Sequence, residues 1–179
     1  MEVTSTPLQG LLVITPRIFT DDRGHFLESW NQRAFNEAIG REVEFVQDNE
    51  SLSHRHVLRG LHFQVAPHAQ CKLVHVVKGH VLDVVVDIRP DSATYGRHFK
   101  IELDGTSKRM LWIPEGFAHG FLALEEDTVF TYKCSRPYDK PSERTILWND
   151  PDLGIDWGVD RPLVSAKDGD GIPFTGNWA

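Results

Sequence analysis

The chain has 179 residues, of which 40% are hydrophobic and 25% are charged, a composition typical of one soluble globular domain. Its formal net charge of -7 at pH 7, with no cluster of lysine or arginine, argues against nucleic acid or an anionic membrane as the main partner. Because no apolar run could cross a bilayer, no signal peptide is visible and Cys71 and Cys134 are the only cysteines, we expect a cytoplasmic protein with reduced thiols.

The N-terminal part of the chain predicts strands and one short helix. Residues 11–20 are apolar and β-branched and suit a strand that bends or ends near Pro16. A turn and a second, alternating strand over residues 25–30 follow. Asn31 can cap a short helix and Gly40 can end it, with an apolar stripe formed by Ala34, Phe35, Ala38 and Ile39. We expect this helix to lie on the sheet as a lid.

The middle of the chain predicts a series of strands. Residues 43–53 return to strand character, with one face formed by Phe45, Gln47 and Asn49. Residues 73–77 and 81–88, joined by a turn at Lys78-Gly79, predict a long hairpin. In its second arm the alternation places Leu82, Val84, Val86 and Ile88 on one face and Val81, Asp83, Val85 and Asp87 on the other. Further strands are expected over residues 97–103, 109–113, 117–124 and 128–134. Beyond Pro137 we expect ordered loops around the barrel, with a short helical turn.

Many short strands separated by turn residues are typical of an all-β sandwich or barrel. The chain shows no alternation of strands and helices, no glycine-rich nucleotide loop, no internal repeat and no linker. We therefore expect residues 1–179 to form a single all-β domain with one or two short helices.

Three basic side chains stand close together on segments with strand character. Arg59, His62 and Lys72 would suit an anionic ligand that carries an acidic carbon. The imidazole can take a proton near neutral pH, the ammonium can neutralise an oxyanion, and the guanidinium can grip a phosphate. These residues alone are equally compatible with charges at strand edges beside one hydrogen-bonded histidine.

A second group of histidines invites a metal-site interpretation. The spacing of Pro114, Gly116 and His119 is similar to the second motif of the cupin superfamily, and His54-Arg55-His56 has the spacing of the first. No glutamate follows this first motif, so the usual carboxylate ligand is missing. We expect no bound metal and place His119 in a polar wall of the cavity; a metal-dependent cupin enzyme using His54, His56 and His119 remains an alternative.

From residue 8 to residue 157 the chain resembles the dTDP-4-dehydrorhamnose 3,5-epimerase family. Several segments carry the resemblance in order and spacing: Asp22-Arg23-Gly24-x-Phe26-x-Glu28, Gln47-x-Asn49-x-Ser51, Leu58-Arg59-Gly60-Leu61-His62-Phe63-Gln64, Ala69-Gln70-x-Lys72-Leu73, residues 112–121, Tyr132-Lys133, Tyr138, and Trp148-Asn149-Asp150-Pro151. The resemblance implies a metal-free, cupin-like jelly-roll barrel, also described as a double-stranded β-helix. It also implies action on dTDP-linked 4-keto-6-deoxyhexoses without a cofactor.

The resemblance also implies roles for single residues. His62 is implied as the base that removes a proton next to the ketone, with Asp168 bound to it. Lys72 is implied as the group that stabilises the enolate, and Tyr132 as the acid on the opposite face. Substrate binding is implied for Arg23, Phe26, Glu28, Gln47, Asn49, Arg59, His119 and Tyr138.

The resemblance implies inversion of C3 and C5 of dTDP-4-keto-6-deoxy-D-glucose, giving dTDP-4-keto-L-rhamnose, and a homodimer with strands exchanged across the interface. Two departures stand out: Cys71 occupies a position where the family usually has glycine, and the agreement thins after Trp157, in the part of the chain that contains Asp168. The alternatives are an epimerase acting at C3 or C5 only, or a non-catalytic sugar-nucleotide-binding barrel.

Overall fold

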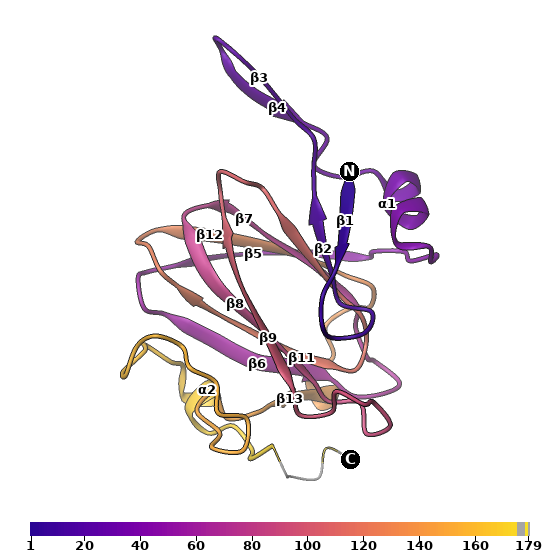
Figure 1. The fold of residues 1–179 in the computed structure, drawn as a ribbon. Helices are drawn as coiled ribbons and strands as arrows, with labels where there is room; N and C mark the ends of the chain where they lie inside the picture. The colour runs from indigo at the N-terminus through magenta and orange to yellow at the C-terminus, as the bar shows by residue number, and fades with distance from the viewer. Residues whose placement is uncertain (175–177, 179) are drawn as a thin grey trace.

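In the computed structural model, which describes residues 1–174 and 178, the chain forms two facing antiparallel sheets, a projecting hairpin and short helices (Figure 1). The six-stranded sheet has the spatial order β1 (Glu2–Ser5), β2 (Leu12–Thr15), β10 (Met110–Ile113), β7 (Lys72–Lys78), β12 (Thr128–Cys134) and β5 (Gln47–Ser53). The five-stranded sheet has the order β13 (Glu143–Thr145), β6 (Leu58–Gln64), β11 (Phe117–Ala123), β8 (His80–Asp87) and β9 (His98–Asp104).

The remaining elements lie around this barrel. The hairpin of β3 (Ile18–Asp21) and β4 (Gly24–Leu27) projects away from it at the top of Figure 1. The helices are α1 (Gln32–Ile39), the 3-10 turn η1 (Lys140–Ser142) and α2 (Ala166–Gly169). The expectation of an all-β jelly-roll barrel with short helices is confirmed. Within the described residues, no helix has the length and apolar character that a membrane crossing requires.

One hydrophobic core fills the space between the two sheets. Strand β8 contributes Val81 and Val85 to it, and the alternate residues Val84 and Val86 pack in a second cluster on the other face of the sheet. This alternation is the one expected for residues 81–88. The second cluster is closed by the chain after β13, including Leu153, Trp157 and Phe174. The C-terminal segment therefore covers the outer face of the five-stranded sheet.

Helix α1 covers part of the six-stranded sheet. Asn31 caps its first turn by accepting a hydrogen bond from the backbone N–H of Ala34 at 3.1 Å, and Gly40 ends it at φ 66°. Its fully buried Phe35 packs against Trp30, Phe45 and Trp112 with ring centroids 5.1–5.7 Å apart. The helix lies on the sheet as expected, but against the outer face and not over the cavity described below.

The predicted hairpin over residues 73–88 is wrong. Strand β7 pairs with β10 and β12, whereas β8 pairs with β9 and β11, so the two strands belong to different sheets. The chain turns between the sheets at Gly79, which has φ +88° and where an added Cβ would lie 2.4 Å from Thr128 Oγ1. A short turn containing glycine has the same sequence pattern in a hairpin and at the corner of a barrel.

Strand boundaries differ from expectation in smaller ways. The chain breaks at Pro16 into β2 and β3, as expected, but strand β4 ends at Leu27 instead of residue 30. Residues 43–46 form no strand, and β5 begins only at Gln47. Strands β1 and β13 were not expected, since neither is long or regular enough to show a period of two.

Candidate active site

A cavity of about 400 Å³ opens between the two sheets. Its walls come from β5 and β12 on one side, β6 and β11 on the other, and the segment that carries α2. Most of the site residues expected from the sequence border it: Asn49, Arg59, His62, Lys72, His119, Tyr132, Tyr138 and Asp168. The barrel therefore brings together residues that are far apart in the sequence, such as Asn49 and Asp168, which are 119 positions apart.

His62 and Asp168 form a close pair in this cavity. His62 Nε2–H donates to Asp168 Oδ1 at 2.5 Å, and the Asp168 side chain also accepts a hydrogen bond from Ser165 Oγ at 2.9 Å. Because Nε2 faces the carboxylate, Nδ1 is the nitrogen of His62 left free to take a proton from a ligand. Burial lowers the pKa of His62, and the hydrogen bond and charge of Asp168 oppose that effect only in part. The imidazole is thus favoured in its neutral, basic form.

The C-terminal segment holds Asp168 in place. Residues on both sides of α2 are tied to the barrel by isolated bridges, Val57 with Leu163 and Ile146 with Ile172. Ser165 caps the short helix by accepting from the backbone N–H of Asp168 at 3.1 Å. Burial alone would raise the pKa of Asp168, but the hydrogen bond and charge of His62 lower it below its usual value. Asp168 is therefore an ionised, nearly buried partner of His62.

Lys72 and Tyr132 come from the opposite sheet. Lys72 Nζ donates to the carbonyl oxygen of His62 at 3.4 Å, and burial lowers the pKa of this lysine. Tyr132 lies on the neighbouring strand β12, two residues before Cys134, which is the register partner of Lys72, and burial raises the pKa of its phenol. A ligand in the cavity would thus lie between a neutral imidazole on one wall and a protonated phenol on the other.

His119 stands beside the His62 pair. On the antiparallel strands β11 and β6 the two histidines are direct register partners. Next to them, Gly60 and Gly120 let the strands approach closely, since an added Cβ on Gly60 would lie 2.4 Å from Gly120 Cα. The buried His119 donates from Nε2 to Asp83 Oδ2 at 2.9 Å. His119 is in the polar wall of the cavity, where it was expected.

Gln47 and Tyr138 lie at an adjoining pocket near the cavity mouth. Gln47 Oε1 accepts a hydrogen bond from the backbone N–H of Tyr138 at 2.8 Å, and its amide donates to Asn49 at 2.9 Å. The Tyr138 ring is 54% exposed, and its hydroxyl donates to Glu143 Oε2 at 3.1 Å. A half-exposed ring at a cavity mouth is available for stacking with a nucleobase.

Three expected binding residues lie outside the cavity of their own chain. Arg23 is at the tip of the β3–β4 hairpin, 90% exposed and paired with Asp21 at 2.6 Å. Phe26 on the same hairpin is 69% exposed, and Glu28 follows it and accepts a hydrogen bond from Asn31 at 3.2 Å. The hairpin borders a separate surface pocket and not the cavity.

The cavity also contains residues that the sequence interpretation did not select. Glu143 pairs with Lys167 at 2.9 Å, and both side chains line the cavity with Ser165. Burial alone would raise the pKa of Glu143, but Lys167 and Tyr138 lower it. Asp83 is fully buried behind His119. Two sequence features could have identified two of these residues. Asp83 is an aspartate at an inward-facing position of an otherwise apolar strand, and Lys167 is adjacent to Asp168.

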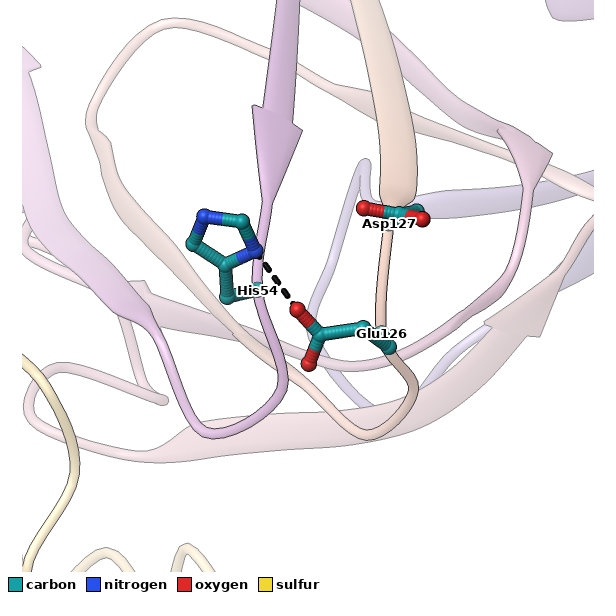
Figure 2. A group of neighbouring side chains, drawn as sticks. All are labelled: His54, Glu126 and Asp127. Atoms are coloured by element: carbon teal, nitrogen blue, oxygen red, sulfur yellow. Dashed lines mark hydrogen bonds and ion pairs between the residues drawn. The ribbon is translucent and has the colours of Figure 1, made fainter.

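The three histidines of the metal-site alternative do not converge. His54 is exposed and binds Glu126 at 2.6 Å, whereas His119 is buried in the cavity wall. In the part of the chain that the structure describes, the one group of ligand-type side chains close enough to share an ion is His54, Glu126 and Asp127 (Figure 2). All three are exposed, and Glu126 also accepts from the Arg55 N–H at 3.0 Å, so the hydrogen bonds of Glu126 to His54 and Arg55 tie two turns together.

Comparison with known proteins gives consistent matches over nearly the whole chain. A family model described as dTDP-4-dehydrorhamnose 3,5-epimerase matches residues 5–175. The dTDP-4-dehydrorhamnose 3,5-epimerases of Shigella flexneri and Pseudomonas aeruginosa are 51% and 50% identical, and each alignment covers 97% of this chain and 96% of the relative. A dTDP-6-deoxy-D-glucose-3,5-epimerase from Legionella pneumophila Philadelphia 1, solved with dTDP-4-keto-L-rhamnose, superimposes with a TM-score of 0.93 at 42% identity, covering 97% of this chain and 92% of that one.

Proposed function

The chain belongs to the dTDP-4-dehydrorhamnose 3,5-epimerase family, and it is an isomerase of a dTDP-linked 4-keto-6-deoxyhexose; we propose how its residues invert C3 and C5 of dTDP-4-keto-6-deoxy-D-glucose to give dTDP-4-keto-L-rhamnose. The observation that carries the proposal is the His62–Asp168 pair, which faces Tyr132 across one cavity. An inversion needs a base on one face of the sugar ring and an acid on the other.

Proton removal is assigned to His62. The C–H bond next to the ketone breaks, the proton moves to Nδ1 of His62, and the electron pair moves to the C4 oxygen. Asp168 stabilises the imidazolium that results, because its carboxylate already holds Nε2–H at 2.5 Å. Lys72 stabilises the oxygen of the enolate, and its lowered pKa makes its ammonium a stronger hydrogen-bond donor.

Proton return is assigned to Tyr132. Its raised pKa keeps the phenol protonated at neutral pH, so it is a donor and a poor base. It delivers its proton to the enolate carbon from the wall opposite His62, and this gives the inverted centre. The same geometry serves C3 and C5, since both carbons flank the C4 ketone, once His62 has released its proton to solvent and Tyr132 has regained one from it. No cofactor takes part in this sequence of steps.

Substrate binding is assigned to both the cavity and the projecting hairpin. Arg59 lines the cavity and suits the diphosphate, while Gln47, Asn49, His119 and Tyr138 contact the nucleoside and the sugar. An isolated two-stranded hairpin is marginally stable in water, and this one exposes Phe19 and Phe26. We therefore assign a homodimer in which the hairpin of one protomer brings Arg23, Phe26 and Glu28 to the cavity of its partner.

Two further expectations complete the proposal. We place the protein in the cytoplasm, where the two free, buried cysteines would stay reduced. We also take residues 1–179 as one domain, since the two sheets share a core.

The reaction is tested by deuterium incorporation from heavy water into dTDP-4-keto-6-deoxyglucose, followed by mass spectrometry and NMR. We expect deuterium at both C3 and C5 with the L-configured product. Deuterium at one carbon alone would identify a single-position epimerase. A protein that binds dTDP without any exchange would be a non-catalytic binding barrel, and the proposal would be wrong.

The dimer is tested by mixing two inactive or weakened variants, Arg23→Ala and His62→Ala. If the hairpin acts on the partner, each hybrid dimer regains one complete site, and random assortment gives about a quarter of wild-type activity at low substrate. As a control, mixing His62→Ala with Asp168→Asn should restore no activity. Each change disables the cavity of the protomer that carries it, so both sites of a hybrid dimer stay defective. Activity no higher than the average of the two parent variants would show that the hairpin does not act in trans.

A further inference from the structure

Asp83 and His119 form a buried pair that the proton transfers above do not use. His119 Nε2 lies 2.9 Å from Asp83 Oδ2, and the two side chains are 9% and 0% exposed. On paired strands, His119 is the register partner of His62, so the two imidazoles occupy neighbouring positions in the cavity wall. The cavity wall therefore contains two adjacent imidazole–carboxylate pairs.

The Asp83 carboxylate depends on His119. Its second oxygen, Oδ1, is buried and has no hydrogen-bond partner among the described residues, and His119 supplies the one side-chain hydrogen bond to Oδ2. Asp168 can pair with a neutral His62 because its carboxylate also accepts a hydrogen bond from Ser165. In contrast, no second side-chain donor among the described residues reaches Asp83, and water cannot solvate its charge there. A neutral imidazole would supply only the hydrogen bond, whereas an imidazolium supplies an opposite charge as well.

Lys72 is the other cation near Asp83. The charge of Asp83 raises the pKa of Lys72, against the larger lowering effect of burial. The hydrogen bond that the structure gives Lys72 Nζ is to the carbonyl oxygen of His62, however, and not to Asp83. His119 is thus the side chain that contacts the carboxylate directly.

The remaining nitrogen of His119 is directed by its surroundings. Nδ1 makes no hydrogen bond within the described part of the chain, and it is not fully buried. The ring borders the cavity. The ring also stacks on Phe130, with centroids 6.0 Å apart and planes at 23°. Asp83 and Phe130 together fix the ring so that Nδ1 is available to a molecule in the cavity.

We propose that Asp83 holds His119 as an imidazolium whose Nδ1–H is a second donor, beside Lys72, to the C4 oxygen as the enolate forms. This inference rests on the proposed function. In the reaction, the proton from carbon still moves to His62 and the electron pair to the C4 oxygen, while His119 keeps both of its protons. Because the Asp83–His119 pair has no net charge, it does not oppose the positive charge that His62 gains. Asp83 acts through His119 and is a positioning residue.

The protonation state is tested on the free protein by NMR of nitrogen-15-labelled histidine, with the His119 signals assigned by their loss in His119→Gln. We expect both nitrogens of His119 to carry a proton at neutral pH in the wild type, and one nitrogen to lose it in Asp83→Asn. A singly protonated His119 in the wild type would overturn the inference, and this result does not depend on whether the Asp83 variant folds.

The role in catalysis is tested by the rate of deuterium exchange at saturating substrate. Loss of one oxyanion donor lowers kcat about 100- to 1,000-fold, so we expect Asp83→Asn to lower kcat at least about tenfold while the Kd for dTDP is retained. Asp87→Asn is the matched control, since Asp87 lies on the same strand, is also fully buried and is bound to Arg89 away from the cavity. It should reduce stability and leave kcat within about twofold, as expected for independent sites.

A double variant separates action through His119 from independent action. If Asp83 acts through His119, the double variant that combines Asp83→Asn and His119→Gln has the same kcat as His119→Gln alone. A double variant whose loss of kcat equals the product of the two single losses would overturn the inference, as would a wild-type kcat in Asp83→Asn. If the wild type incorporates no deuterium, the proposed function fails and this inference with it. If the wild type is active with a singly protonated His119, the proposed function stands and only this inference fails.

Discussion

Replacing Asp168 with asparagine tests the proposed base most directly. Asparagine has nearly the same size, so the packing around this 3%-exposed side chain is kept while its charge is removed. The native carboxylate holds His62 Nε2 at 2.5 Å and would stabilise the imidazolium formed in the reaction. Losing a charged hydrogen bond and its counter-charge costs about 2–4 kcal/mol, which corresponds to a rate about 30- to 1,000-fold lower at C3 and C5.

The same substitution changes the pH dependence in a defined direction. Burial lowers the pKa of His62 and Asp168 opposes this, so removing the carboxylate lowers the pKa of His62 further. A base must be unprotonated to act, and the acid limb of the kcat/KM profile should therefore move to lower pH while the plateau falls. The plateau falls in addition because the asparagine NH2 can donate to Nε2 and force the imidazole proton onto Nδ1.

The assay is deuterium exchange into the substrate across a range of pH, with dTDP affinity measured separately. Asp170→Asn is the matched control, because it removes the same charge two residues away from an exposed position at the end of α2. We expect the control to behave as the wild type. Wild-type exchange in Asp168→Asn, or an acid limb that moves to higher pH, would refute the assignment of His62 and Asp168.

Three further predictions concern proton return and stability. Tyr132→Phe should still exchange protons with solvent at C3 and C5 but give little inverted product, which NMR of the recovered sugar will show; rapid net inversion would exclude Tyr132 as the acid. Phe35→Ala should lower the free energy of unfolding by about 3–5 kcal/mol in a denaturant titration and leave kcat unchanged, because Phe35 is fully buried outside the cavity. Asp87→Asn should cost about 2–4 kcal/mol at neutral pH, since Asp87 is bound by Arg89, Ser92 and Thr94. Burial would raise the pKa of Asp87, but these groups hold it well below its usual range. The contribution of Asp87 to the free energy of unfolding is therefore complete above a pH of about 4 and is lost as the pH falls toward the lowered pKa. An unchanged slope of stability against pH in the variant would contradict this.

Local patterns in the sequence predicted the strands better than their partners. The alternation in residues 81–88 placed Val81 and Val85 on one face and Val84 and Val86 on the other, and the two core clusters confirm it. That alternation depends only on the period of a strand. The pairing of β7 with β12 and of β8 with β11 depends on contacts far apart in the chain, and a turn at Gly79 is compatible with either arrangement.

The cavity residues were predicted from the resemblance, and the structure shows which of them meet. His62 and Asp168 are 106 positions apart, and no spacing rule connects them; their contact depends on the way the C-terminal segment is tied back to the barrel at Leu163 and Ile172. Arg23 and Phe26 lie on a hairpin that leaves the barrel, and the sequence of the hairpin contains no sign of that direction. Glu143 was missed because a lone glutamate in a loop has the pattern of a solvated charge.

The distribution of charge explains how an acidic protein can bind an anionic nucleotide sugar. The net charge is -7, so long-range electrostatics alone would disfavour a diphosphate. Inside the cavity, however, the carboxylates of Glu143 and Asp168 are already bound to Lys167 and His62. The hydrogen bonds that the structure gives Arg59 and Lys72 go to neutral oxygens, of Ser53, Leu52 and His62, so their charges are left for the ligand. Because Lys72 is buried between low-dielectric walls, its attraction for the enolate oxygen is screened far less than the repulsion from the solvated acidic surface. Arg59 is more exposed, and it would attract the diphosphate through direct contact at the cavity.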